Sequence, residues 1–222
     1  MVLHTVLTPS ADHGQRRARR RHALGTRASA FQAAPAARPT TCVVGIGTND
    51  LLLPFLSTRP GWRQIMAIRS RLMHSCTSDD DFVRDYRALI SRIQAAGLTT
   101  VIVGLPLIEL RDYPDDVCAR RNLMLRDIAA QTDCTFVDAA AAMAAAGPAL
   151  PAARRYAWSR FPPIRVMDAV IMQIAPPTKD WFTVLRRLQL TVDGVHWNSR
   201  AAKAVAHAID DALDDAEVPV PE

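Results

Sequence analysis

The stretch from Cys42 to Asp50, CVVGIGTND, constrains the fold of this chain more than any other. An apolar run of strand-forming residues stops at a glycine, and small polar side chains follow at once. In an open α/β sheet the carboxyl ends of the strands are where ligands meet the protein. Asn49 can donate two N–H groups, which suits a group that holds an oxyanion. The alternative is a strand followed by an Asx-type turn without a binding role.

Further apolar runs alternate with amphipathic stretches along the chain. The segments 99–106 and 135–138 have the composition of buried parallel strands. Between them, residues 114–131 carry a helical pattern with Val117, Met124 and Ile128 facing inward. Alternation of this kind predicts a doubly wound α/β fold.

A helix is expected after Thr77 or Ser78, either of which can cap it. Its first turn is Asp79-Asp80-Asp81, where acids complement the positive end of the helix dipole. Gly97 ends the helix. Its inward stripe consists of Phe82, Tyr86, Leu89, Ile90 and Ile93. An earlier segment, 51–78, is expected to hold a loop and a helix that includes Trp62.

A second polar motif, Asp193-Gly194-Val195-His196, follows an apolar, strand-like run near the carboxyl end. Asp and His three residues apart on one loop can share a hydrogen bond that fixes the imidazole tautomer and supports an imidazolium. The alternative is a helix cap with a surface histidine. Ser199 is expected to cap a final helix over residues 200–213.

Taken together, these motifs resemble the SGNH hydrolase superfamily, also called GDSL esterases and lipases, over residues 41–213. Gly47, Asn49 and Asp50 match its Gly-x-Asn-Asp block, and Asp193 and His196 match its Asp-x-x-His block. The resemblance implies a flavodoxin-like, three-layer α/β sandwich with a parallel sheet in the order 2-1-3-4-5. It also implies a serine esterase that acts on a small-molecule carboxylic ester.

In this scheme His196 is the general base, Asp193 orients it and Asn49 stabilises the oxyanion. Asn49 and His196 should then lie on the same edge of the sheet, within about 15 Å of each other, because each role needs contact with one small ligand. Asn122 and Asp138 stand where such proteins often carry these residue types, and both are assigned structural roles.

The family's Gly-Asp-Ser nucleophile block is not found in the chain. Ser10 has a glycine, Gly14, at the family spacing, but Thr8 and Pro9 stand where Gly and Asp belong. Gly25 falls near the place of a second oxyanion donor. Ser10 is therefore a nucleophile candidate, with an ordinary polar residue as the alternative. The function has two interpretations: a serine esterase, or a truncated or degenerate SGNH protein without catalytic activity.

Positive charge is concentrated in residues 1–40, which carry a formal charge of +6 while the whole chain carries +5. The segment is interpreted as a disordered arm, or as an aberrant beginning of the kind that out-of-frame GC-rich codons produce, ahead of a hydrolase-like domain over 41–215. Its basic run lacks the aromatic interleaving of nucleic-acid binding, so no nucleic-acid partner is expected. Val2–Leu7 is its one apolar candidate for the first strand, and it is predicted to pair beside residues 42–46.

No secretory signal or membrane-spanning run is readable in the sequence, so a cytoplasmic location is expected. The four cysteines show no metal-ligand spacing, and neither a metal nor a cofactor is expected. The long interval 139–190 holds aromatic residues and prolines that predict either a lid or acyl-binding wall, or an irregular packed insertion. The sequence does not indicate an oligomeric state.

Overall fold

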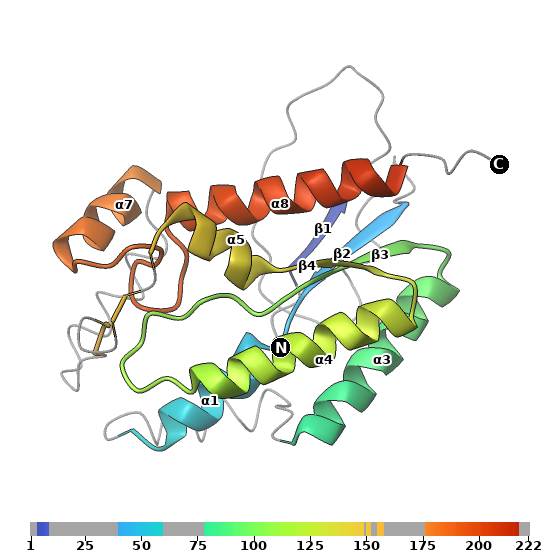
Figure 1. The fold of residues 1–222 in the computed structure, drawn as a ribbon, viewed down its shortest axis with the longest axis horizontal. Helices are drawn as coiled ribbons and strands as arrows, with labels where there is room; N and C mark the ends of the chain where they lie inside the picture. The colour runs from blue at the N-terminus through green and yellow to red at the C-terminus, as the bar shows by residue number, and fades with distance from the viewer. Residues whose placement is uncertain are drawn as a thin grey trace.

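The computed structural model describes residues 4–8, 40–59, 78–148, 150–151, 155–157 and 176–217 (Figure 1). Its sheet has the strand order β1-β2-β3-β4. The strands are β1 (His4–Thr8), β2 (Thr41–Gly45), β3 (Thr99–Val103) and β4 (Thr135–Val137). The last three run parallel to one another, as expected for this α/β class. The expected helix around Trp62 lies outside the described residues.

Alternate side chains of the strands enter two separate cores, which makes the fold a three-layer sandwich. Val43, Val101 and Val103 belong to one core, whereas Val44 and Ile102 belong to the other. This two-sided burial explains why β2 and β3 are nearly continuous apolar runs without polar alternation. The predicted α/β sandwich is confirmed.

Of the described helices, three cover the first face: α1 (Thr48–Ser57), α3 (Asp79–Ala95) and α4 (Asp115–Gln131). The cap of α3 is Ser78, whose hydroxyl accepts the backbone N–H of Asp81. The stripe predicted for α3 is buried, with Leu89 packed at its margin. On α4 the buried stripe runs through Cys118, Arg121, Leu125 and Ile128, so of the three residues predicted to face inward only Ile128 is fully buried.

Helices α5 (Ala139–Ala146) and α8 (Ser199–Glu217) cover the other face, and α7 (Pro176–Leu185) lies beside the start of α8 (Figure 1). The cap predicted at Ser199 is wrong by one residue: the Asn198 side chain accepts the Ala201 N–H at 3.0 Å. Asn198 also donates to the Gln189 carbonyl at 2.8 Å, so its amide uses both ends. A serine hydroxyl lacks a separate acceptor and donor atom that could reach both partners, which explains why Asn198 caps the helix.

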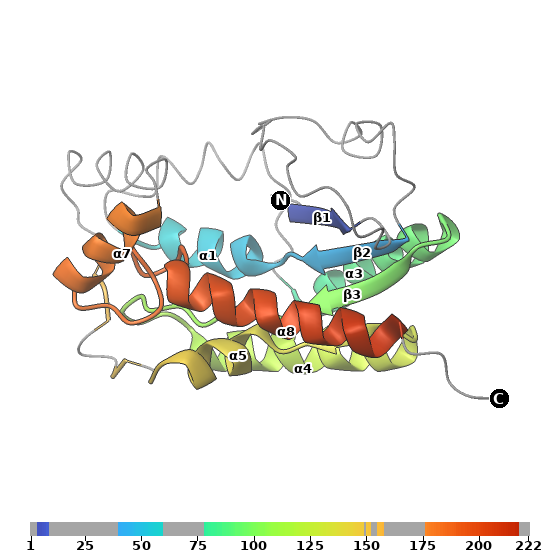
Figure 2. The same ribbon diagram turned by 90° about the horizontal axis from the view of Figure 1, so that it is seen from above.

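The strand predicted from Val2–Leu7 is present as β1 and pairs beside β2, which confirms that prediction. Its direction differs from the parallel first strand that the resemblance implied. β1 runs antiparallel, with His4 opposite Gly45 and Thr8 opposite Thr41, and forms an edge of the described sheet. Figure 2 shows β1 pointing away from the end toward which β2 and β3 point.

None of the helices in the described ranges combines the length and the apolar character needed to cross a membrane.

Candidate active site

Asn49 lies in the first turn of α1, immediately after the turn that ends β2. The chain passes from Gly45 to the helix cap Gly47, and α1 begins at Thr48. A helix therefore starts where the alternative placed an Asx-type turn, while the binding role of Asn49 stays a prediction. The Asn49 side chain is half-buried, and among the described residues none hydrogen-bonds it. Its amide can therefore donate to a bound group beside the positive end of α1.

Gly47 makes this sharp turn possible. Its φ of +110° lies in the left-handed region, which side chains rarely adopt. A Cβ at this position would lie 2.9 Å from Cε2 of Phe82 and 3.1 Å from Cδ2 of Leu105. The turn that presents Asn49 is thus packed directly against α3 and the loop after β3.

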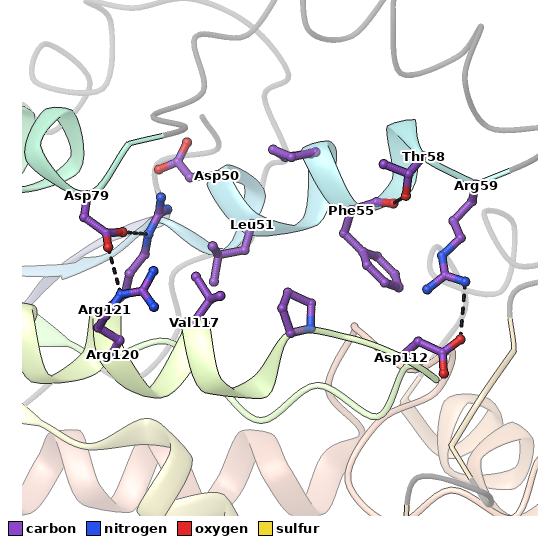
Figure 3. Close-up of a pocket in the computed structure, with 12 residues that line it drawn as sticks. Asp50, Leu51, Phe55, Thr58, Arg59, Asp79, Asp112, Val117, Arg120 and Arg121 are labelled. Carbon is purple, nitrogen blue, oxygen red and sulfur yellow. Dashed lines mark hydrogen bonds and ion pairs between the residues drawn. The ribbon is translucent and has the colours of Figure 1, made fainter.

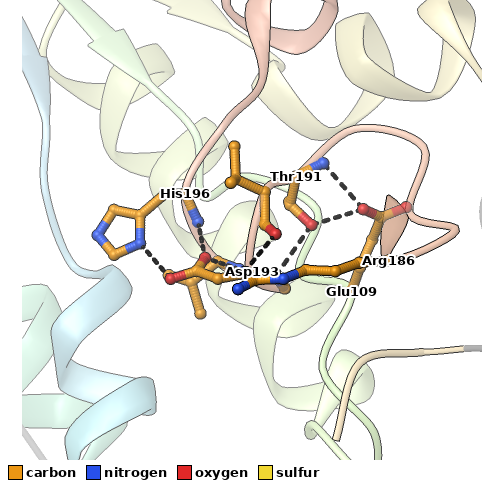
Figure 4. A network of polar contacts seen from close by, with 8 residues as sticks. Glu109, Arg186, Thr191, Asp193 and His196 are labelled. Atoms are coloured by element: carbon orange, nitrogen blue, oxygen red, sulfur yellow. Dashed lines mark hydrogen bonds and ion pairs between the residues drawn. The ribbon is translucent and has the colours of Figure 1, made fainter. Parts of the chain in front are cut away.

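Asp193 and His196 lie on the loop between α7 and α8. One carboxylate oxygen of Asp193 is 2.8 Å from Nδ1 of His196, and the other accepts the His196 backbone N–H at 2.9 Å (Figure 4). Asp193 is 3% exposed, whereas the His196 side chain is 52% exposed. The predicted hydrogen bond is confirmed, and because it engages Nδ1, proton exchange with a substrate would fall to Nε2.

The run before Asp193 is not a strand, in contrast to the sequence-based expectation. It is a loop closed by an isolated antiparallel bridge between Thr191 and Trp197, with the Val192 N–H donating to the His196 carbonyl at 2.8 Å. This tight loop makes the Asp193–His196 contact local.

The pKa of Asp193 lies below its ordinary value. Burial raises this pKa, but the opposite effect of the polar contacts is larger. The pKa is lowered by the hydrogen bond from His196, by the charge of that ring and by the backbone N–H groups of His196 and Val195. Asp193 is therefore a carboxylate at neutral pH, as an acid that orients a histidine must be.

Glu109 holds this loop in place, and sequence analysis did not identify it. Its carboxylate is 4% exposed and accepts four N–H or O–H groups from residues 189–191 (Figure 4). Glu109 lies in the loop after β3, far from its partners in sequence. A lone glutamate gives no periodic or motif signal, so only the fold could show its role.

The two motifs meet the same loop after β3, at the carboxyl end of the parallel strands. Leu105 of that loop lies against Gly47, and the backbone N–H of Glu109 donates to the Gly194 carbonyl at 2.8 Å. In Figure 2, β2 and β3 point toward the end of the molecule where α1 and α7 lie. Both motifs thus contact the loop after β3, while the shared edge and the separation expected for the Asn49 and His196 side chains stay predictions.

Ser10 and Gly25 lie outside the described residues, so their assignments stay predictions. Asn122 and Asp138 have the structural roles expected. The Asn122 amide accepts the Leu105 N–H at 2.6 Å and donates to the Leu105 carbonyl at 3.0 Å. Asp138 caps α5 through the Ala141 N–H at 2.9 Å.

A cavity of about 400 Å³ lies elsewhere, between α1 and α4 (Figure 3). Asp79 pairs with Arg120 and Arg121 at one end, and Arg59 pairs with Asp112 at the other. Neither Asn49 nor His196 lines this cavity. Its acids and bases neutralise one another, so its walls give no net charge that would select a ligand.

A three-layer α/β fold with a carboxylate–histidine pair at the carboxyl edge of its sheet is typical of hydrolases. The chain belongs to the GDSL-like lipase/acylhydrolase family, whose model matches residues 8–204. None of the curated proteins matches it significantly.

Solved structures of esterases and hydrolases also resemble the chain. A catalytic mutant of Axe2, an acetylxylan esterase from Geobacillus stearothermophilus, is 17% identical, with a TM-score of 0.42 over 79% of this chain and 59% of the other. LAE5, an alpha/beta hydrolase enzyme from the metagenome of Lake Arreo, is 18% identical, with a TM-score of 0.42 over 79% and 60%. The acetyl xylan esterase AlAXEase is 14% identical, with a TM-score of 0.40 over 81% and 68%. The chain thus spans about three fifths of the length of the first two.

Proposed function

We propose that this chain is a hydrolase of small carboxylic esters in which Asp193 and His196 form the acid–base pair. The observation that carries the proposal is the 2.8 Å contact from the buried Asp193 carboxylate to Nδ1 of the half-exposed His196 ring. Family membership supports the reaction class, because the matching family is one of lipases and acylhydrolases.

In the proposed mechanism a serine hydroxyl attacks the ester carbonyl carbon while Nε2 of His196 takes its proton. Asp193 fixes the tautomer and stabilises the imidazolium that forms. The same histidine then protonates the leaving alcohol, and water hydrolyses the acyl-serine with His196 again acting as base. Asn49 donates to the tetrahedral oxyanion, a role worth about 3 kcal/mol where one such donor was removed from another enzyme.

Replacing His196 tests this mechanism. The full chain is expected to hydrolyse p-nitrophenyl acetate, and His196→Ala should reduce kcat by about a thousandfold or more, because the proton acceptor is lost. His207, an exposed histidine on α8, supplies the matched control. His207→Ala should leave kcat unchanged, and equal losses in the two variants would reject the role of His196.

A second candidate function, a family member without hydrolytic activity, is favoured by the direction of β1. Ser10 is the serine that the family spacing selects, and β1 ends two residues before it at Thr8. Thr8 lies opposite Thr41, at the other end of β2 from Asn49. The two residues from Thr8 to Ser10 can span at most about 7 Å, whereas the length of β2 that separates Thr41 from the Asn49 end is about 13 Å. This distance argues against Ser10 as the nucleophile beside Asn49.

Ser10→Ala separates the two functions. Under the hydrolase proposal with Ser10 as nucleophile, this variant loses activity as completely as His196→Ala. Retained activity would assign the attack to another group. A full chain with no more hydrolysis than His196→Ala would instead support the second candidate.

A further inference from the structure

The Glu109 carboxylate is bound by three consecutive backbone N–H groups and one hydroxyl of the loop that carries Asp193 and His196. The Gln189 N–H donates to Oε1 at 3.1 Å, and the Leu190 and Thr191 N–H groups donate to Oε2 at 3.1 and 2.9 Å. The Thr191 hydroxyl donates to Oε2 at 2.6 Å. Successive N–H groups that converge on one anion form a nest, a backbone arrangement that favours negative charge.

This arrangement specifies a carboxylate rather than an amide. Burying an ionised group is costly unless hydrogen bonds replace its water, and Glu109 receives donors at both oxygens. All of them are neutral N–H or O–H groups. A glutamine would have to turn its own NH₂ donors toward this row of donors, or leave some of them without an acceptor.

Two further contacts connect Glu109 to Gly194, which lies between Asp193 and His196 in the motif. The Thr191 hydroxyl, which donates to Glu109, also accepts the Gly194 N–H at 3.2 Å. The Glu109 backbone N–H donates to the Gly194 carbonyl at 2.8 Å. Both backbone groups of the residue after Asp193 are thus fixed by Glu109, directly or through Thr191.

Gly194 fits this close approach because it has no side chain. Its φ is +90°, and a Cβ there would lie 2.5 Å from Cδ2 of Leu110. The loop is therefore clamped between the side chain of Glu109 and that of the next residue in sequence. Little freedom remains for Asp193 to shift relative to the end of β3.

We propose that Glu109 is a positioning residue for the Asp193–His196 pair, acting through the loop and not through contact with substrate. The inference rests on the proposed function of that pair. Its consequence is that Glu109 sets the rate of the chemical step while leaving substrate affinity nearly unchanged. A Glu109 that served stability alone would alter unfolding but not the histidine in the folded protein.

The test uses the full chain with Glu109→Gln, Glu109→Asp and Thr191→Val. The control is Thr100→Val, because the buried Thr100 hydroxyl has no hydrogen-bond partner within the part of the chain that the structure describes. The first readout is the downfield NMR resonance of the His196 Nδ1–H in its hydrogen bond to Asp193. The second is kcat and KM for p-nitrophenyl acetate, both measured well below the unfolding transition.

We expect Glu109→Gln and Thr191→Val to broaden or remove the downfield resonance. Both should lower kcat by about ten- to a hundredfold with KM within about twofold, because a small displacement of a catalytic group costs this much. Glu109→Asp, which keeps the negative charge, should retain part of the downfield resonance and part of the wild-type kcat. Thr100→Val should match the wild type in both.

The outcomes separate the two proposals. A sharp resonance and unchanged kcat in folded Glu109→Gln and Thr191→Val would overturn the positioning role and leave the hydrolase proposal intact. A wild type that shows the resonance but no hydrolysis would reject the hydrolase proposal, while the NMR comparison would still decide the positioning role. A wild type without the resonance would overturn both. If Glu109→Gln does not fold, Thr191→Val decides.

Discussion

Asp193 is a buried acid whose negative charge is supported by a histidine and by two backbone N–H groups. The pKa of Asp193 in the folded protein lies below the ordinary value of 3.8. The ionised carboxylate is therefore more stable in the native state than in the unfolded chain. The stability this contributes is complete above the unfolded pKa and is lost as pH falls through the folded one.

This sign gives a prediction for acid stability. The free energy of unfolding of the wild type should exceed that of Asp193→Asn by a constant amount near pH 5, and the gap should narrow below about pH 4. Urea unfolding of both proteins from about pH 5 downward measures it. A gap that widens on acidification would contradict the lowered pKa.

Residues differ in how far the sequence alone identifies them. Asp193 and His196 could be found because their contact is local and their spacing is a motif. Glu109 could not, because its partners lie 80 to 82 positions away and no pattern marks it. Asn198 shows the same limit at short range: two polar residues compete for one cap, and the contact to Gln189 decides between them.

Among the elements, β2 and α1 are joined by a tightly packed turn near the candidate site. Gly47→Ala should lower the free energy of unfolding by about 2–4 kcal/mol, because a left-handed conformation alone costs about 1–2 kcal/mol and the clash with Phe82 adds to it. Gly97→Ala supplies the control. Its φ of +76° imposes strain, but nothing lies within 4 Å of the new Cβ.

Thermal or urea unfolding of the two variants separates strain from clash. The excess loss in Gly47→Ala over Gly97→Ala reports the contact with α3 and the loop after β3. Equal losses in the free energy of unfolding would show that Phe82 and Leu105 move aside for the new Cβ without a measurable destabilisation.

Strands and helices with strong local patterns were predicted well. β2, β3 and α3 have continuous apolar runs or a clear stripe with a cap, so propensity and burial agree. The direction of β1 was not predictable, because a short strand of five residues carries no signal for its orientation relative to the neighbouring strand. The start of α1 at Thr48 was not predicted, because a glycine followed by small polar residues is also the pattern of a turn.

For the molecule as a whole, β1 protects one edge of the parallel sheet. Without it, β2 would expose a row of backbone donors and acceptors beside the buried Cys42, Val43 and Val44. Buried amides without partners cost about 1–3 kcal/mol each, against a total stability of about 5–15 kcal/mol.

The chain shortened to residues 41–222 should therefore give less soluble protein than residues 1–222 and a lower, broader unfolding transition. Expression yield and calorimetry of both proteins measure the difference. Equally sharp unfolding at the same temperature would show that β1 contributes nothing to the fold.

The hydrogen bonds of Glu109 also imply an order of assembly during folding. They join the loop after β3 to residues 80 to 82 positions further along the chain, and contacts of such long separation close only after nearer ones have reduced the search. The parallel strands and α3 can form before the chain has reached α8. The hydrogen bonds between Glu109 and residues 189–191 should thus form late in refolding, when most of the secondary structure already gives its native signal.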